Sequence, residues 1–312
     1  MGLVTDIGKV NDRSFNQSAW NGLQQAEREL DALVEYIETA DTRDYAKNIN
    51  TFADEDYDVI VTVGFNLGEA TRAAAEVEDY QDTKFIGIDQ DHAEDPLDNL
   101  TGLVFPEDRA GFLVGALAAM MSETHMVGAV CASDDIPPVW RLGEGYKAGA
   151  GYVDELNELT TSVLVLYHND VSFETTFVDP EWGETSANAM MKEGVDIIFG
   201  CGGATGNGAL IAAARAEIYA IGVDTDQYLT LPQAAPRMLS SAVKLITPGV
   251  FELLKSAKAG NFPGRNYLGD VTYAPFHDLE NQIPAEVKAA LEEINTGLQD
   301  GSIKTNVPSE KP

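Results

Sequence analysis

The chain has 312 residues and carries 51 Asp and Glu against 20 Lys and Arg, a net charge of −31. This excess argues against a nucleic-acid partner, because phosphate binding needs a basic patch, and it disfavours docking on anionic lipid. Since 44% of the residues are apolar, the chain can bury proper cores and is not expected to be disordered. The acidic residues are spread along the whole chain, and we interpret them as an adaptation to high salt, where screening weakens self-repulsion.

Short Val- and Ile-rich segments alternate with amphipathic helical segments, which is typical of an α/β protein with parallel sheets. Strands are predicted at 2–6, 33–38, 58–63, 84–88, 101–105, 126–132, 161–167, 195–200, 219–223 and 239–243. Helices are predicted at 16–30, 67–80, 109–122, 142–156, 181–193, 207–217, 250–259 and 284–299, with an extended segment at 266–276 and a loose tail at 305–312. Ten strands are too many for one small sheet, so we predict two doubly wound lobes.

A faint internal repeat supports two similar lobes. Segments 58–64 and 85–89, with a helix between them, are echoed by segments 196–202 and 220–224. In each copy the second strand ends in an aspartate, Asp89 in one and Asp224 in the other. Apolar strands can repeat by chance in any α/β protein, but a shared terminal aspartate favours a true repeat.

Cys131 and Cys201 each lie in or just after an apolar run, and we predict buried free thiols rather than a disulfide or a metal pair. The four histidines show no metal-ligand spacing, so no metal site is expected. The longest apolar run, 110–121, is shorter than the roughly 20 residues that a membrane-spanning helix needs. A strand follows Met1 almost directly, so no signal peptide is expected within this sequence.

Three aspartates stand where ligands bind in open parallel sheets, beyond the carboxyl ends of strands. They are Asp6, Asp89 and Asp224. A carboxylate accepts two hydrogen bonds side by side, which suits the vicinal hydroxyls of a ribose or another sugar, although each aspartate alone could cap a helix or a turn. Lys244 ends a further strand; it would offset the desolvation of these carboxylates and donate to a ligand oxygen, or it is an ordinary surface lysine.

Aromatic residues follow strands in both predicted lobes. Phe15 can offer its face to a flat base, and the neighbouring Asn16 can donate and accept hydrogen bonds toward the edge of that base. Phe177 lies in the corresponding loop of the second lobe, so two rings would sandwich the base. The alternative is that each ring only packs its loop onto a helix.

The glycine-rich segment 200–208 follows a strand and opens a helix, as a dinucleotide fingerprint does. Thr205, however, occupies the position of the third glycine, and no phosphate-binding loop motif occurs elsewhere. The nucleophile-elbow motif of α/β-hydrolases is also absent. We therefore predict no cofactor and no catalytic residue.

The motifs at Leu3–Gly8, Asn11–Gly22, Phe85–Asp89, Gly222–Gln227 and Ser241–Lys244 carry a specific resemblance. From residue 2 to about residue 276 the chain resembles the basic membrane protein family, substrate-binding lipoproteins of ABC importers similar to purine nucleoside receptor A. The resemblance implies a type I periplasmic-binding-protein fold and a nucleoside ligand, with a purine favoured. It also implies that this ligand is bound by Asp6, Phe15, Asn16, Asp89, Phe177, Asp224 and Lys244. Phe173 could take the place of Phe177.

The same resemblance implies an N-terminal lobe of residues 1–106 plus 246–271 and a C-terminal lobe of residues 107–245 plus 272–312, with the ligand cleft between them. We expect an extracytoplasmic receptor that closes on its ligand and delivers it to ABC permease subunits. It would sit on the outer face of the cell membrane through a lipid anchor outside this sequence. The alternatives are a nucleoside hydrolase on the same fold, with Asp6 or Asp89 as base, and a binding protein for another small molecule such as a sugar.

Overall fold

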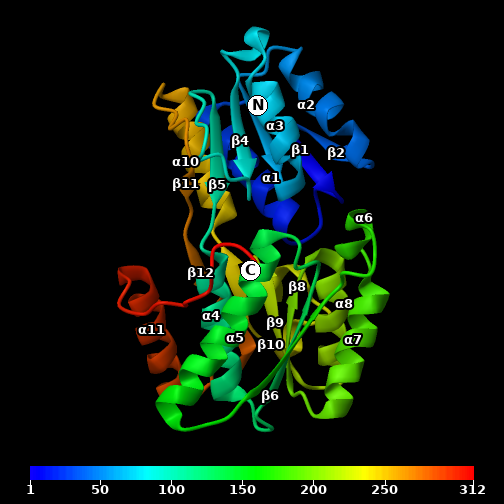
Figure 1. Cartoon of the computed structure of the whole chain (residues 1–312), viewed down its shortest axis with the longest axis vertical. Helices are drawn as coiled ribbons and strands as arrows, with labels where there is room; N and C mark the ends of the chain where they lie inside the picture. Colours follow the sequence, from blue (N-terminus) through cyan, green and yellow to red (C-terminus); the bar gives the residue numbers. More distant parts are fainter. The chain divides into compact units, whose positions relative to one another are not determined.

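The computed structural model describes residues 1–312, except for the side chain of Glu174. The chain divides into two compact units, each built from separate stretches of sequence: unit 1 is Met1–Phe105 with Leu245–Asp270, and unit 2 is Pro106–Lys244 with Val271–Pro312. Each unit is a six-stranded sheet with helices on both faces (Figure 1). The predicted α/β class with two doubly wound sheets is confirmed.

Unit 1 contains an entirely parallel sheet in the order β11-β5-β4-β3-β1-β2. Its strands are β1 (Gly2–Ile7), β2 (Glu35–Thr39), β3 (Val59–Val63), β4 (Lys84–Ile88), β5 (Leu100–Val104) and β11 (Tyr267–Leu268). Its helices are α1 (Phe15–Leu30), α2 (Tyr45–Ala53), α3 (Gly68–Ala75) and α10 (Ile246–Lys258), with α1 packed on α10 and α2 on α3. Because β1, β3 and β4 are parallel neighbours, the residues that follow them meet at one edge of the sheet.

Unit 2 contains a sheet in the order β12-β10-β9-β8-β6-β7, in which only β12 is antiparallel to its neighbour. Its strands are β6 (Met126–Cys131), β7 (Ser162–Tyr167), β8 (Ile197–Cys201), β9 (Tyr219–Asp224), β10 (Met238–Lys244) and β12 (Val271–Tyr273). Its helices are α4 (Glu107–Met121), α5 (Pro137–Asn157), α6 (Phe173–Thr176), α7 (Pro180–Glu193), α8 (Gly203–Arg215), α9 (Gln227–Thr230) and α11 (Ala285–Asp300). Helices α7 and α8 cover one face of this sheet, and α4 and α5 cover the other (Figure 1).

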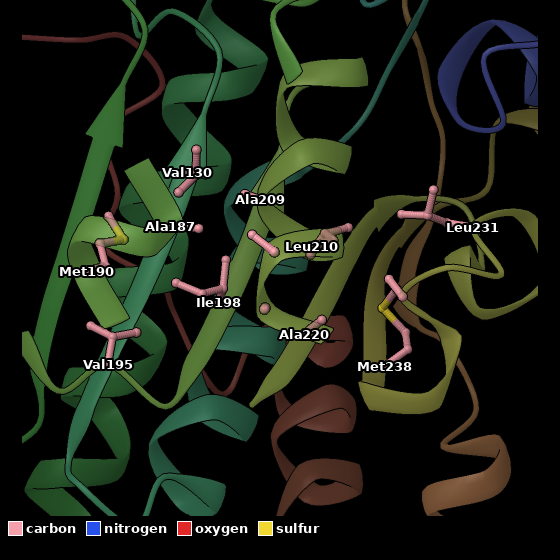
Figure 2. Close-up of a cluster of buried hydrophobic side chains, with 13 residues drawn as sticks. Val130, Ala187, Met190, Val195, Ile198, Ala209, Leu210, Ala220, Leu231 and Met238 are labelled. Carbon is pink, nitrogen blue, oxygen red and sulfur yellow. The ribbon is translucent and has the colours of Figure 1, made fainter. Parts of the chain in front are cut away.

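The core between the unit 2 sheet and helices α7 and α8 is a continuous aliphatic cluster (Figure 2). Val130 of β6 and Ile198 of β8 meet Ala187 and Met190 of α7 and Leu210 of α8 in it. All of β8 is buried, as is usual for a central strand covered on both faces. This packing fixes the carboxyl ends of the strands, where the predicted ligand-binding residues lie.

All ten predicted strands are present, with each end within two residues of the predicted one. Helix α2 is absent from the predicted elements, because its apolar face is short, consisting chiefly of Tyr45, Ile49 and Phe52. Helix α5 begins at Pro137, five residues before its predicted start, since proline is well suited to the first turn of a helix. Among the described residues, no helix is both long and apolar enough to cross a membrane.

The prediction of a loose C-terminal tail is wrong. Thr305 donates a hydrogen bond to the Asp108 carboxylate at the start of α4. Arg141 of α5 donates to the Ser309 carbonyl at 3.1 Å, and the Lys311 ammonium lies 2.7 Å from the Asp134 carboxylate. These contacts hold the tail against the N-terminal ends of α4 and α5, which the tail's composition alone does not reveal.

The prediction of two free thiols is also wrong, since Cys131 and Cys201 form a disulfide. They end the neighbouring parallel strands β6 and β8 and stand opposite each other in the register, with their Cα atoms 4.4 Å apart. The sequence shows that each cysteine lies near the end of an apolar run, but it does not show that the two strands pair.

Candidate functional site

The carboxylate of Asp6 is fixed at the end of β1. Its Oδ1 accepts a hydrogen bond from the Ile7 backbone N–H at 2.6 Å and another from the hydroxyl of Tyr45, a buried residue at the start of α2. Gly64, which follows β3, has a φ of +119°, and a Cβ there would lie 2.9 Å from Asp6 Oδ2. The carboxylate therefore rests against the backbone of the neighbouring strand end. Tyr45 is a partner that the sequence analysis does not identify.

Asn16 is buried in the first turn of α1, where Asp12 caps the helix. The Asp12 carboxylate accepts backbone hydrogen bonds from Ser14, Asn16 and Gln17 at 2.8, 2.9 and 3.1 Å. Burial raises the pKa of Asp12, and these three donors oppose part of that rise. Asn16 Nδ2 donates to the Lys9 carbonyl at 3.3 Å, whereas its buried Oδ1 has no hydrogen-bond partner among the described residues. An unsatisfied buried oxygen of this kind is suited to accept a hydrogen bond from a ligand.

Asp89 and Asp224 share an uncommon backbone conformation. Asp89 directly follows β4 and has a φ of +60°, while Asp224 ends β9 and has a φ of +65°. The left-handed region is unfavourable for residues with a Cβ, although Asp tolerates it better than most, and such residues gather at functional sites. The same left-handed backbone conformation at equivalent strand ends of both units supports the internal repeat that the sequence predicts.

In unit 2 the end of β9 meets the end of the neighbouring strand β10. Lys244 is almost completely buried, with an exposed fraction of 3%. Its Nζ lies 3.9 Å from Asp224 Oδ1 and 3.9 Å from Glu107 Oε1. Glu107 is fully buried in the first turn of α4, and its Oε2 accepts a hydrogen bond from Arg141 Nε at 2.8 Å. The structure thus brings Asp224 and Lys244 together, and Lys244 is not a surface lysine. It adds Glu107 and Arg141, which no sequence motif indicates.

Phe177 and Phe173 lie together at α6, with ring centroids 5.8 Å apart and an edge-to-face angle of 71°. Both rings are partly exposed. The backbone N–H of Thr205 in α8 donates to the Phe177 carbonyl at 3.2 Å, and a Cβ at Gly203 would lie 2.8 Å from that carbonyl oxygen. The glycines that open α8 therefore allow the loop carrying Phe177 to approach the helix closely.

His168, at the end of β7, holds both ends of the loop that carries the two phenylalanines. Its buried imidazole lies 3.0 Å from the Asp170 carboxylate and 3.2 Å from the Asp179 carboxylate, and it stacks on Trp182 at a centroid distance of 4.0 Å. Hydrogen bonds to Asp179 from the Trp182 backbone and then from His168 lower the pKa of that carboxyl. A lone histidine in the sequence gives no sign of this role.

The remaining predicted residue, Phe15, begins α1 beside Asn16 and is half-buried. In unit 1, Asp6, Asn16 and Asp89 thus all come from the ends of β1 and β4 and the start of α1. Among the described residues, no group of three or more His, Cys, Asp or Glu side chains is placed to hold a metal ion. The arrangement offers hydrogen bonds and ring faces to a ligand.

Comparison with known proteins identifies the family. The model of a family described as "ABC transporter substrate-binding protein PnrA-like" matches residues 2–268. A CD4+ T-cell-stimulating antigen of Listeria monocytogenes is 32% identical to the chain, over 99% of this chain and 88% of its own length. The ABC transporter nucleoside-binding protein BmpA of Lactococcus lactis is 30% identical, over 98% of this chain and 88% of its own.

A solved structure supports the fold. An ABC transporter solute-binding protein from Aeropyrum pernix superposes with a TM-score of 0.84 at 23% identity, covering 97% of this chain and 92% of that one. The chain therefore shares the fold of that solved structure. Together with the family match over residues 2–268, this shows that the chain belongs to the family of PnrA-like ABC transporter substrate-binding proteins.

Proposed function

We propose that this chain is a receptor that binds a nucleoside, with a purine base favoured, and presents it to the permease of an ABC importer. The observation that carries the proposal is the pair Asp89 and Asp224, which occupy equivalent strand ends in the two units with the same left-handed backbone. A carboxylate can accept hydrogen bonds from two neighbouring ribose hydroxyls. The nucleoside-binding relative from Lactococcus lactis supports this class of ligand.

The base would be recognised by rings and one amide. We propose that Phe15 of unit 1 and Phe177 of unit 2 stack on it, with Phe173 as the alternative to Phe177, because both loops present partly exposed rings. The unsatisfied Oδ1 of Asn16 can accept a hydrogen bond from a base N–H or amino group. In this proposal both units contribute to one ligand, and Asp6 and Lys244 complete the polar contacts.

The Cys131–Cys201 disulfide supports a location outside the cytoplasm, since disulfides persist mainly in oxidising compartments. Membership of an ABC substrate-binding family supports permease subunits as partners. We propose an extracytoplasmic receptor on these grounds, and its lipid attachment to the membrane stays a prediction.

Calorimetric titration of the protein with adenosine and with adenine tests the proposed ligand. We expect adenosine to bind at least about 10-fold more tightly than adenine. A ligand without ribose leaves the aspartate carboxylates without hydroxyl partners from the ligand, which costs about 1–3 kcal/mol. Free ribose serves as the control for the contribution of the base and should bind weakly. Equal affinities for adenosine and adenine would contradict the proposed role of Asp89 and Asp224.

The proposal also holds that no bond of the ligand is broken. The samples from the titration, kept for several hours and separated by chromatography, should contain intact adenosine only. Release of adenine at a rate above that of a protein-free sample would instead support a nucleoside hydrolase.

A further inference from the structure

Thr205 stands in the glycine-rich segment 200–208, where a dinucleotide fingerprint would have its third glycine. It lies in the first turn of α8, and its side chain is completely buried. Thr205 makes three hydrogen bonds to the loop that carries Phe173 and Phe177. Two of these bonds need the hydroxyl group, so a glycine could not make them.

The three bonds hold backbone groups of the loop around Phe177. The backbone N–H of Thr205 donates to the Phe177 carbonyl at 3.2 Å, and Thr205 Oγ1 donates to the Thr176 carbonyl at 2.8 Å. The same Oγ1 accepts a hydrogen bond from the Asp179 backbone N–H at 3.0 Å. The hydroxyl thus acts as a donor on one side of Phe177 and as an acceptor on the other. The backbone on both sides of the Phe177 ring is therefore fixed to α8.

The start of α8 is itself a rigid support. A Cβ at Gly183 of α7 would overlap the Thr205 carbonyl oxygen, and a Cβ at Gly208 of α8 would overlap the Pro180 carbonyl oxygen. The N-terminal ends of the two helices are thus in direct backbone contact, and the loop that carries Phe177 leads directly into α7. Closely packed elements of this kind deform little, so Thr205 holds the loop against a fixed support.

We propose that Thr205 is a positioning residue that holds the Phe177 ring in place for the base before the ligand binds. A ring that is fixed in advance loses less conformational entropy on binding than a ring on a loop that the ligand must order. None of the three bonds involves Phe173, so they favour Phe177 as the stacking ring. This inference rests on the proposed function, in which a ring of this loop stacks on the base.

The substitution Thr205→Val tests the inference, with adenosine as the titrant. Valine keeps the shape of threonine but has no hydroxyl, so the loop loses two of its three bonds to α8. We expect adenosine to bind about 10-fold more weakly than to the wild type.

The matched control is Thr83→Val, which also removes a buried threonine hydroxyl that donates to a backbone carbonyl, that of Tyr57 at 3.1 Å. Thr83 precedes β4, at the end of the strand opposite to Asp89. This variant should bind adenosine within about twofold of the wild type.

A double-mutant cycle with Phe177→Ala separates positioning from a structural role. If Thr205 acts through the Phe177 ring, Thr205→Val should weaken adenosine binding less than about twofold in a protein that already carries Phe177→Ala. A general disturbance of unit 2 would give the same loss in both backgrounds. Thr205→Ser, which keeps the hydroxyl, should bind adenosine within about threefold of the wild type.

Hydrogen exchange of the ligand-free wild type gives a second test that needs no variant. The amide hydrogens of Thr205 and Asp179, which form two of the three bonds, should exchange far more slowly than in an unfolded chain. Rapid exchange of both amides would show that the loop is not held in advance and would overturn the inference. If Thr205→Val lacks the circular dichroism spectrum of the folded protein, Thr205→Ala replaces it in the cycle.

The possible outcomes separate this inference from the proposed function. Equal losses from Thr205→Val in the wild-type and Phe177→Ala backgrounds would overturn the inference, as would wild-type affinity in the folded variant. Unchanged adenosine affinity in Phe177→Ala would also overturn it and would leave Phe173 as the proposed stacking ring. If the wild type binds neither adenosine nor other nucleosides, it is the proposed function that fails, and this is read before any variant is made.

Discussion

The substitution Asp224→Asn is expected to weaken adenosine binding by about 10- to 100-fold. Asparagine keeps the size of the side chain but replaces one acceptor oxygen by a donor and removes the charge, and a hydrogen bond to a charged group contributes about 1.5–3 kcal/mol. The Lys244 ammonium, 3.9 Å away, also loses the charge of a neighbouring carboxylate. Calorimetry with adenosine measures the effect.

The same change at the equivalent position, Asp89→Asn, is expected to give a loss of similar size, because the two aspartates share their place and their backbone conformation in the two units. Asp82→Asn, which alters an exposed aspartate of unit 1, is the control for charge alone and should leave binding unchanged. Unaltered adenosine affinity in a folded Asp224→Asn protein would contradict the assignment of the ribose site.

Removal of the disulfide is expected to cause the largest loss of stability. The Cys131–Cys201 bond closes a long loop, with the two cysteines 70 residues apart, and a crosslink of that span lowers the entropy of the unfolded chain by an amount worth about 4 kcal/mol. The double substitution Cys131→Ala and Cys201→Ala should therefore lower the free energy of unfolding of unit 2 by about 2–5 kcal/mol. Urea denaturation followed by circular dichroism measures it.

A reductant provides the internal control for this experiment. Dithiothreitol added during unfolding should lower the urea midpoint of the wild type and leave that of the double variant unchanged, because the variant has no bond to reduce. Identical midpoints for the wild type and the double variant would show that the bond contributes nothing to stability.

The sequence predicts the strands well because most of them are buried runs rich in branched apolar residues, such as Val59–Val63. It also locates Asp89 and Asp224, since a carboxylate at the end of such a run lies at the ligand edge of a parallel sheet. The register of strand pairing is harder to predict, and for that reason the sequence does not predict the disulfide. Only the pairing of β6 with β8 places Cys131 opposite Cys201.

The parts of the site that the sequence does not reveal depend on contacts between residues far apart in the chain. Glu107 and Lys244 meet only because α4 packs on β10, and Tyr45 reaches Asp6 only because α2 lies beside β1. In the sequence His168 is an isolated histidine, and only the fold brings Asp170 and Asp179 to its two ring nitrogens. Adaptation to high salt, inferred from the net charge of −31, stays a prediction.

Native mass spectrometry of freshly purified protein tests most directly whether this chain is a nucleoside receptor. A receptor that encloses its ligand retains part of it through purification, so we expect a population heavier than the bare chain by the mass of one nucleoside. After unfolding and dialysis, the refolded protein should show that mass shift again when adenosine is added. A retained mass corresponding to another class of small molecule, together with no shift on addition of adenosine or other nucleosides, would contradict the account.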